Sequence, residues 1–184
     1  MKSSQINYTY IAFLRGINVG GHHKIAMAEL KKELEGIGMK NVHTLLNSGN
    51  VIFYSESVGV EKLEEKITEH LKTTYGFAVP VIITTAEEIR KLYTFAPFQD
   101  IAITKDIRLY VSFLKKNRDP LPDLPWTTPD ESFSIINQVG KAVFSVLDVS
   151  ASKTTNAMKF LEDFFGKDIT TRNWNTVERI LKKI

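Results

Sequence analysis

Apolar and polar positions in the first half of the chain predict the order strand, helix, strand, strand, helix, strand. The run at residues 8–14 is apolar on both alternating faces, which is typical of a central strand covered on both sides. Apolar residues elsewhere recur either at helical spacing or in short strand-like runs. The expected strands are 8–14, 42–46, 51–54 and 79–84, and the expected helices are 27–37 and 60–75. This is the order of a ferredoxin-like βαββαβ subdomain, which we predict over residues 1–95.

Local signals fix several boundaries in this half. The tetrapeptide Asn47-Ser48-Gly49-Asn50 separates two strand-like runs, and Asn and Gly tolerate the backbone of a tight hairpin turn. Gly76 is suited to end the second helix. Thr85 and Glu88 have the spacing of a capping box, so a third, short helix should run to Tyr93.

The second half predicts a further small sheet closed by two C-terminal helices. Residues 107–114 alternate, with Arg108, Tyr110 and Ser112 expected to face outward. A hairpin should turn at Gly140, and residues 117–130 hold four of the six prolines and should form a stiff loop. The fold class is therefore α+β, with residues 105–184 as a second α+β subdomain that shares the core of the first.

The amino-acid composition excludes several kinds of site and indicates the class of protein. The chain has 184 residues, 43% of them hydrophobic and 24% charged, as in ordinary globular proteins. It has no cysteine, which excludes disulfides, thiolate metal sites and cysteine nucleophiles. The first residues lack the apolar core of a secretory signal, and no apolar run has the length of a membrane span. We therefore expect a cytoplasmic protein without membrane association.

The best functional candidate is the glycine-rich loop at residues 15–24. It links a strand to a helix, so its backbone N–H groups and cations can face an anion at a helix N-terminus. It departs from a Walker A loop, because His22 and His23 stand where Lys and Ser/Thr are needed. The dinucleotide pattern Gly-x-Gly-x-x-Gly is also missing. The candidate ligand-binding residues here are Arg15, Gly16, Asn18, Gly20, Gly21 and Lys24.

Two further segments carry polar groups. Asn47, Ser48 and Asn50 are primarily turn residues, but their side chains can line a pocket; a hydrolase elbow would need strand-to-helix context. The histidines show no metal-ligand spacing, so we expect no metal and no cofactor, and we assign no catalytic residue. Whether the protein is an enzyme stays open.

Near the C-terminus, Arg172, Asn173 and Trp174 allow two interpretations. Asn173 or Asn175 can cap the last helix, while Arg beside Trp can stack on a base and hold phosphate. Residues 150–184 hold seven basic and four acidic residues, which accounts for the whole net charge of +3. A surplus of that size is too small to argue nucleic-acid binding alone.

With these residues in view, the chain resembles a bacterial family catalogued as domain of unknown function 1697. The resemblance runs from Tyr10 to near Leu181, and the family commonly has Gln where this chain has Asn47. It implies an α/β protein with a ferredoxin-like first half and brings no established activity, substrate or cofactor. The motifs that carry it are residues 12–21, Met27, Leu30, 34–38, Val42, Thr44, 47–53, 171–174, Thr176 and Val177.

The leading hypothesis is a protein that binds a small phosphate- or carboxylate-bearing ligand at the loop of residues 15–24. The alternatives are a nucleic-acid-binding module that uses Arg172, Trp174 and the basic last helix, and a protein–protein interaction module. Strand order should place the tetrapeptide at 47–50 beside the glycine loop. We also expect residues 172–174 to fold over that end as a wall of one pocket.

Overall fold

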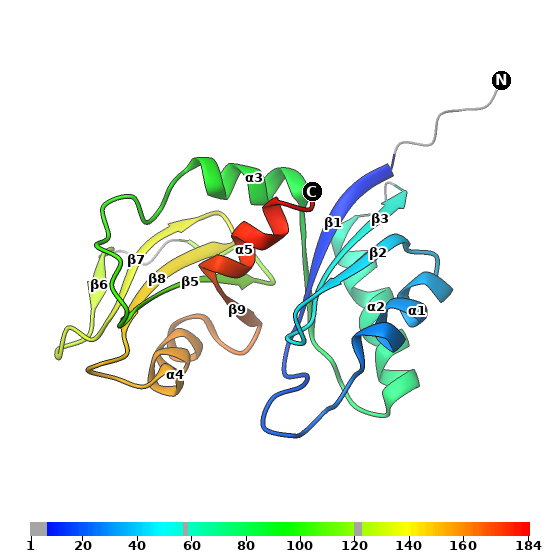
Figure 1. The fold of residues 1–184 in the computed structure, drawn as a ribbon, viewed down its shortest axis with the longest axis horizontal. Helices are drawn as coiled ribbons and strands as arrows, with labels where there is room; N and C mark the ends of the chain where they lie inside the picture. The colour runs from blue at the N-terminus through cyan, green and yellow to red at the C-terminus, as the bar shows by residue number, and fades with distance from the viewer. Residues whose placement is uncertain (1–6, 57–58, 120–122) are drawn as a thin grey trace. The chain divides into compact units, whose positions relative to one another are not determined.

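The computed structural model describes residues 7–56, 59–119 and 123–184. The chain divides into two compact units (Figure 1). The first contains the described residues up to Ile89 together with Ile180–Ile184, and the second is Arg90–Arg179. The sequence predicts a boundary at residues 95–105 and assigns the whole C-terminus to the second subdomain. Its claim of a shared core stays a prediction.

The first unit is an antiparallel sheet with two helices on one face (Figure 1). Its strands are hydrogen-bonded in the order β2-β3-β1-β4. Tyr10, Ala12 and Leu14 form one core with Leu30 of the first helix and Ile67 of the second. The elements are β1 (Asn7–Leu14), α1 (Met27–Gly36), β2 (Lys40–Leu45), β3 (Asn50–Glu56), α2 (Val60–Tyr75) and β4 (Val81–Thr85).

Strand register decides which loops meet at the end of β1. Phe13 pairs with Asn50, the first residue of β3, and Leu14 pairs with Val81, the first residue of β4. The 47–50 turn therefore emerges beside the loop that leaves β1. This confirms the predicted neighbourhood of the two polar segments.

The second unit is a five-stranded antiparallel sheet in the order β6-β7-β8-β5-β9. One face packs on α4, with Val143 and Leu147 of β8 against Leu161. Val111 of β5 and Phe144 of β8 are cross-strand neighbours and point to the other face. The elements are β5 (Ile107–Leu114), β6 (Trp126–Thr127), β7 (Phe133–Val139), β8 (Ala142–Asp148), α4 (Thr154–Phe165) and β9 (Ile169–Asn173). Two more helices, α3 (Ala86–Thr94) and α5 (Trp174–Leu181), each run across the division between the units.

The α+β class and most elements agree with the sequence analysis. The capping box forms: Thr85 N–H donates to Glu88 Oε2 over 2.9 Å, and Glu88 N–H donates to Thr85 Oγ1 over 3.1 Å. Gly76 ends α2 in the left-handed region, at φ 75°. Local rules therefore held where the deciding residues are adjacent in sequence.

Three expectations in the second unit were wrong. Residues 169–173 form strand β9 on the edge of the sheet, where no strand was predicted. Trp126–Thr127 pairs with β7 inside the predicted loop. Ser112 faces the core because α4 covers that side too, and its hydroxyl lies 2.8 Å from Thr171 Oγ1.

Candidate functional site

The glycine loop leaves β1 with its backbone anchored on both sides. Leu14 N–H donates to Gly49 O over 2.8 Å, and Arg15 N–H donates to Pro80 O over 2.9 Å. These bonds join the start of the loop to the β2–β3 turn and to the residue before β4. The first residues of the loop are therefore hydrogen-bonded to two neighbouring segments.

Asn18 ties the loop together through its side chain. Its Nδ2 donates to Ile25 O over 2.9 Å and to Asn47 O over 2.8 Å, while Oδ1 accepts from Ile25 N–H over 2.9 Å. The residue sits in the left-handed region, at φ 56°, which Asn tolerates better than most residues. Both amide hydrogens of Asn18 have backbone partners, so this side chain positions the loop. Asn18 was predicted to orient a ligand. With its amide engaged in this way, it would do so by positioning the loop.

The tip of the loop is a tight turn from Val19 to His22. His22 N–H donates to Val19 O over 3.2 Å, with Gly20 at φ 60° and Gly21 at φ 81° between them. Two consecutive positive φ angles are the signature of a type I′ turn, and glycine adopts them without a steric penalty. A Cβ at Gly21 would meet nothing within 4 Å, so the backbone conformation, and not crowding, requires glycine there.

The base of the loop is closed by His23. Its ring stacks on Phe77, with centroids 4.3 Å apart, and Nδ1 lies 3.3 Å from Gly16 O. Lys24 and His22 are exposed. Within residues 7–56, 59–119 and 123–184, no group of three or more histidines and acidic residues could hold a metal ion.

The 47–50 turn packs tightly under the loop. Asn50 is fully buried, and its Nδ2 donates to Leu45 O over 2.9 Å and to Ser48 Oγ over 3.0 Å. A Cβ on Gly49 would lie 2.8 Å from both Ile17 Cδ1 and Leu14 Cβ. Asn50 and Gly49 therefore serve the packing of the turn, while Asn47 and Ser48 are exposed beside the loop.

Arg172 and Asn173 belong to β9 of the second unit. Arg172 is 9% exposed, and its Nη1 donates to Thr170 Oγ1 and to Thr171 O, each over 2.9 Å. Burial lowers the pKa of Arg172 to about 10. Asn173 Oδ1 accepts from Asn175 N–H over 3.0 Å, which supports the capping interpretation.

Trp174 begins α5 inside an aromatic cluster. Its ring is edge-on to Phe98 and Phe144, at centroid distances of 5.2 and 6.1 Å, and stacks on Tyr93 at 6.2 Å. The structure thus brings together the two segments of the first unit and keeps residues 172–174 within the second. The common pocket stays a prediction.

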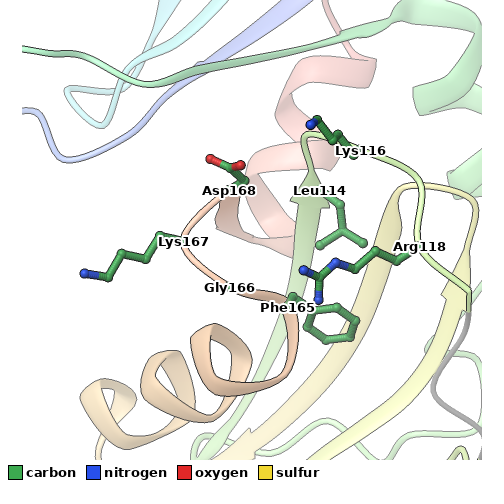
Figure 2. Close-up of a pocket in the computed structure, with 7 residues that line it drawn as sticks. All are labelled: Leu114, Lys116, Arg118, Phe165, Gly166, Lys167 and Asp168. Carbon is green, nitrogen blue, oxygen red and sulfur yellow. The ribbon is translucent and has the colours of Figure 1, made fainter.

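A cavity in the second unit was not anticipated from the sequence (Figure 2). Its volume is about 110 Å³, and it lies where β5 ends, next to the turn between α4 and β9. Two stretches of chain that are far apart in sequence, residues 114–118 and 165–168, build it, so no linear motif predicts it. The lining residues are Leu114, Lys116, Arg118, Phe165, Gly166, Lys167 and Asp168.

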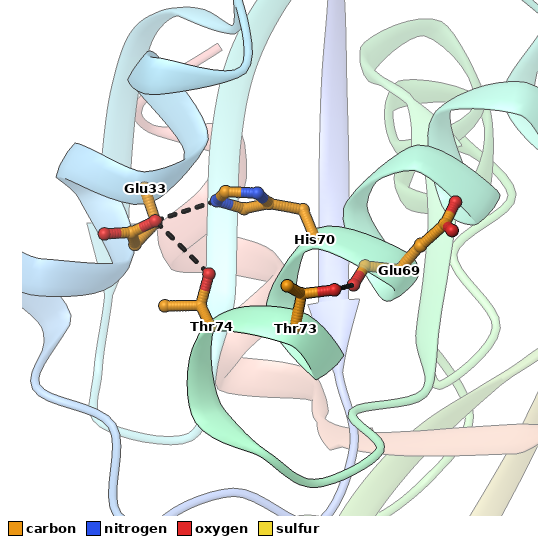
Figure 3. A network of polar contacts seen from close by, with 5 residues as sticks. All are labelled: Glu33, Glu69, His70, Thr73 and Thr74. Atoms are coloured by element: carbon orange, nitrogen blue, oxygen red, sulfur yellow. Dashed lines mark hydrogen bonds and ion pairs between the residues drawn. The ribbon is translucent and has the colours of Figure 1, made fainter.

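A polar network in the first unit joins α1 to α2 (Figure 3). His70 Nε2 and Glu33 Oε2 are 2.8 Å apart, and Thr74 Oγ1 donates to the same oxygen over 3.4 Å. Nearby, burial and the carboxylates Glu33 and Glu29 raise the pKa of Tyr75. His70 is thus engaged in a helix–helix contact.

The fold and the glycine loop define an α+β protein with two antiparallel sheets and a fixed polar loop at one sheet end. The family described as "Protein of unknown function (DUF1697)" matches residues 8–144, and the chain belongs to this family. Residues 171–177, which the sequence analysis included in the resemblance, lie beyond the matched part.

One solved structure similar to this chain is described as the conserved bacterial protein SP0830 from Streptococcus pneumoniae. The TM-score is 0.70 at 25% sequence identity, and the similarity covers 96% of this chain and 98% of that chain. No curated protein matches the chain. In the described ranges, no helix has both the length and the apolar character needed to cross a membrane.

Proposed function

We propose that the protein binds a small phosphate- or carboxylate-bearing ligand at the loop of residues 15–24. The tip of the loop supports this proposal, since Gly20 and Gly21 turn an exposed stretch of backbone and have no side chains of their own to cover its N–H groups. Successive N–H groups in such turns form concave anion sites. Lys24 adds an exposed cation on the same loop.

The observation that carries the proposal is the set of side-chain bonds made by Asn18. They hold the loop to Asn47 and Ile25, so the N–H groups of the tip have a fixed direction before any ligand arrives. A preorganised site loses less entropy on binding than a flexible one.

The start of α1 adds to the field at the loop. The N-cap residue, Ala26, makes no side-chain hydrogen bond, so no side chain caps the first N–H groups of the helix. Their partial positive charge favours an anion nearby. Glu29 in the first turn acts against this, which makes Lys24 the more important source of positive charge.

A ligand screen with matched variants tests the proposal. Nucleotides, sugar phosphates and organic acids are screened by thermal shift, and calorimetry then measures the affinity of each hit. Lys24→Gln should weaken a hit about tenfold or more, as expected for a lost charge-assisted hydrogen bond. Lys32→Gln, which removes an exposed lysine of α1, should leave affinity unchanged. No stabilising compound, or equal losses in the two variants, would refute the proposal.

Nucleic-acid binding remains the alternative that salt separates best. Several phosphate contacts on a single strand make log K fall by about 0.7 per contact against log salt, whereas one bound anion gives a slope near one or less. Because the ring of Trp174 is packed in an aromatic cluster, nucleic-acid binding has less support than binding of a small anion at the loop.

A protein–protein role has one observation in its favour. Val19 at the loop tip is 67% exposed and Leu46 beside the turn is 44% exposed. Both flank the contact between Asn18 and Asn47. Under this alternative, Val19→Ser would abolish capture of a partner and leave small-ligand affinity unchanged. We also propose that the first unit is ferredoxin-like, which its strand order β2-β3-β1-β4 supports, and that the protein is cytoplasmic.

A further inference from the structure

Two hydrogen bonds fix the chain segments that line the cavity of the second unit. Lys115 N–H donates to Asp168 O over 3.0 Å, which fixes the end of β5 to the residue before β9. Gln138 is 8% exposed, and its Nε2 donates to Arg118 O over 2.9 Å. Arg118 therefore has a fixed backbone position although its side chain is exposed.

The guanidinium of Arg118 is the central cation of the cavity. It reaches over Phe165 toward Gly166, and the ammonium groups of Lys116 and Lys167 lie further out (Figure 2). Nη1 donates to Phe164 O over 3.1 Å, which uses one of the five N–H donors of an arginine. No other side-chain hydrogen bond of Arg118 is found within the described chain, so the remaining donors can face a ligand.

Gly166 gives the cavity its wall of bare backbone. Its φ of 78° and ψ of −170° fall in a region that is essentially limited to glycine. A Cβ at this position would stand 3.9 Å from Arg118 Nη2, on the side where the guanidinium lies. The backbone turn that follows α4 thus leaves the guanidinium uncovered.

The charge of the lining side chains and the size of the cavity indicate which kind of ligand it can bind. The lining carries three basic side chains and one carboxylate, Asp168, so its net charge favours an anion. Phosphate carries about −1.5 to −2 at neutral pH, and the planar fork of arginine suits its oxygens. A volume of about 110 Å³ is large enough for one tetrahedral phosphate group.

We propose that this cavity is a binding site for the phosphate group of a small phosphate-bearing molecule, with Arg118 as its main ligand and Lys116 at its rim. Leu114 and Phe165 supply an apolar floor for the carbon adjacent to the phosphate ester. The inference goes beyond the proposed function of the glycine loop and does not rest on it, because all the lining residues belong to the second unit.

Nuclear magnetic resonance of the ¹⁵N-labelled full chain tests the site, with inorganic phosphate as probe at constant ionic strength. Saturable shifts are expected at the amides of Lys116, Gly166 and Lys167. Arg118→Gln should weaken the apparent affinity at least tenfold and Lys116→Gln about threefold. Arg118→Lys, which keeps the charge but loses the fork, should fall between Arg118→Gln and the unchanged protein.

The matched control is Arg108→Gln. Arg108 also donates from Nη1 to backbone carbonyls, at 2.6 Å to Lys105 O and 3.1 Å to Ile107 O. It lies six residues from Leu114 along β5, about 20 Å away at about 3.3 Å per residue. Its loss should leave phosphate affinity unchanged.

The pattern of amide shifts distinguishes phosphate binding in the cavity from phosphate binding at the glycine loop. Shifts confined to Gly20, Gly21 and Lys24 would overturn the cavity site while supporting the loop. Shifts at Gly166 that Arg118→Gln removes would support the cavity whatever happens at the loop. Non-saturable shifts at Gly166, or equal affinity in Arg118→Gln and Arg108→Gln, would overturn the inference.

Discussion

The side-chain amide of Asn18 donates a hydrogen bond to the backbone carbonyl of Asn47 over 2.8 Å, across 29 positions of sequence. The same amide also satisfies both backbone groups of Ile25. One residue thus joins the end of β1, the start of α1 and the β2–β3 turn. The shape of the proposed anion site depends on this residue more than on any charged one.

The first prediction concerns the stability that Asn18 supplies. Asn18→Ala should lower the free energy of unfolding by about 1–3 kcal/mol, because it leaves the N–H and carbonyl of Ile25 without partners. Urea unfolding followed by circular dichroism measures it. The matched control is Asn41→Ala: Asn41 is exposed and has a similar φ of 50°. Equal losses in the two variants would show that backbone conformation, not hydrogen bonding, explains Asn18.

Alanine substitutions at Gly49 and Gly21 distinguish the cost of side-chain crowding from the cost of backbone strain. Both have positive φ, at 74° and 81°, so alanine at either position costs about 1–2 kcal/mol. Only at Gly49 would the new Cβ lie 2.8 Å from Ile17 and Leu14. Gly49→Ala should therefore be less stable than Gly21→Ala by about 1–3 kcal/mol. The two free energies of unfolding, measured side by side, decide this, and equal values would contradict the close packing.

The sequence predicted the neighbourhood of the loop and the turn because the order of the strands and their antiparallel direction largely determine it. It missed the role of Asn18, since an amide in a glycine loop has the same pattern whether it faces a ligand or the backbone. The strand at 169–173 was missed because its polarity suggested a loop, although Ile169, Thr170 and Thr171 are β-branched residues that favour strands. The cavity around Arg118 needed tertiary structure, because its lining residues come from separate segments.

The pH dependence of stability should report on Asp130. Its Oδ1 accepts from Thr128 Oγ1 over 2.6 Å and from Ser132 Oγ over 2.8 Å, and these bonds lower the pKa of Asp130 below its ordinary value of 3.8. A carboxyl group whose pKa is lower in the folded state than in the unfolded state stabilises the fold at pH values above its unfolded pKa. This stabilisation is lost as the pH falls through the folded-state pKa.

Asp130→Asn should therefore be less stable than the unchanged protein at pH 7, and the difference should shrink as pH falls below about 4. Urea midpoints measured from pH 7 down to pH 3 test this. Asp100→Asn, at another exposed aspartate of the second unit, is the control for the loss of one surface charge. A difference for Asp130→Asn that stays constant with pH would contradict the assignment.

The last prediction asks whether Trp174 holds the fold or is available to a ligand. The residue is 8% exposed and edge-on to Phe98 at 5.2 Å and to Phe144 at 6.1 Å. Removal of so large a buried ring costs about 3–5 kcal/mol, so Trp174→Ala should lower the free energy of unfolding by that amount. Trp174→Phe, which keeps an aromatic ring in the cluster, should cost less. Tyr93→Ala serves as the control, because Tyr93 stacks on Trp174 at 6.2 Å but is 50% exposed and should contribute less. A loss below about 1 kcal/mol for Trp174→Ala would mean that the cluster does not depend on the ring. That result would return Trp174 to the set of residues available for binding.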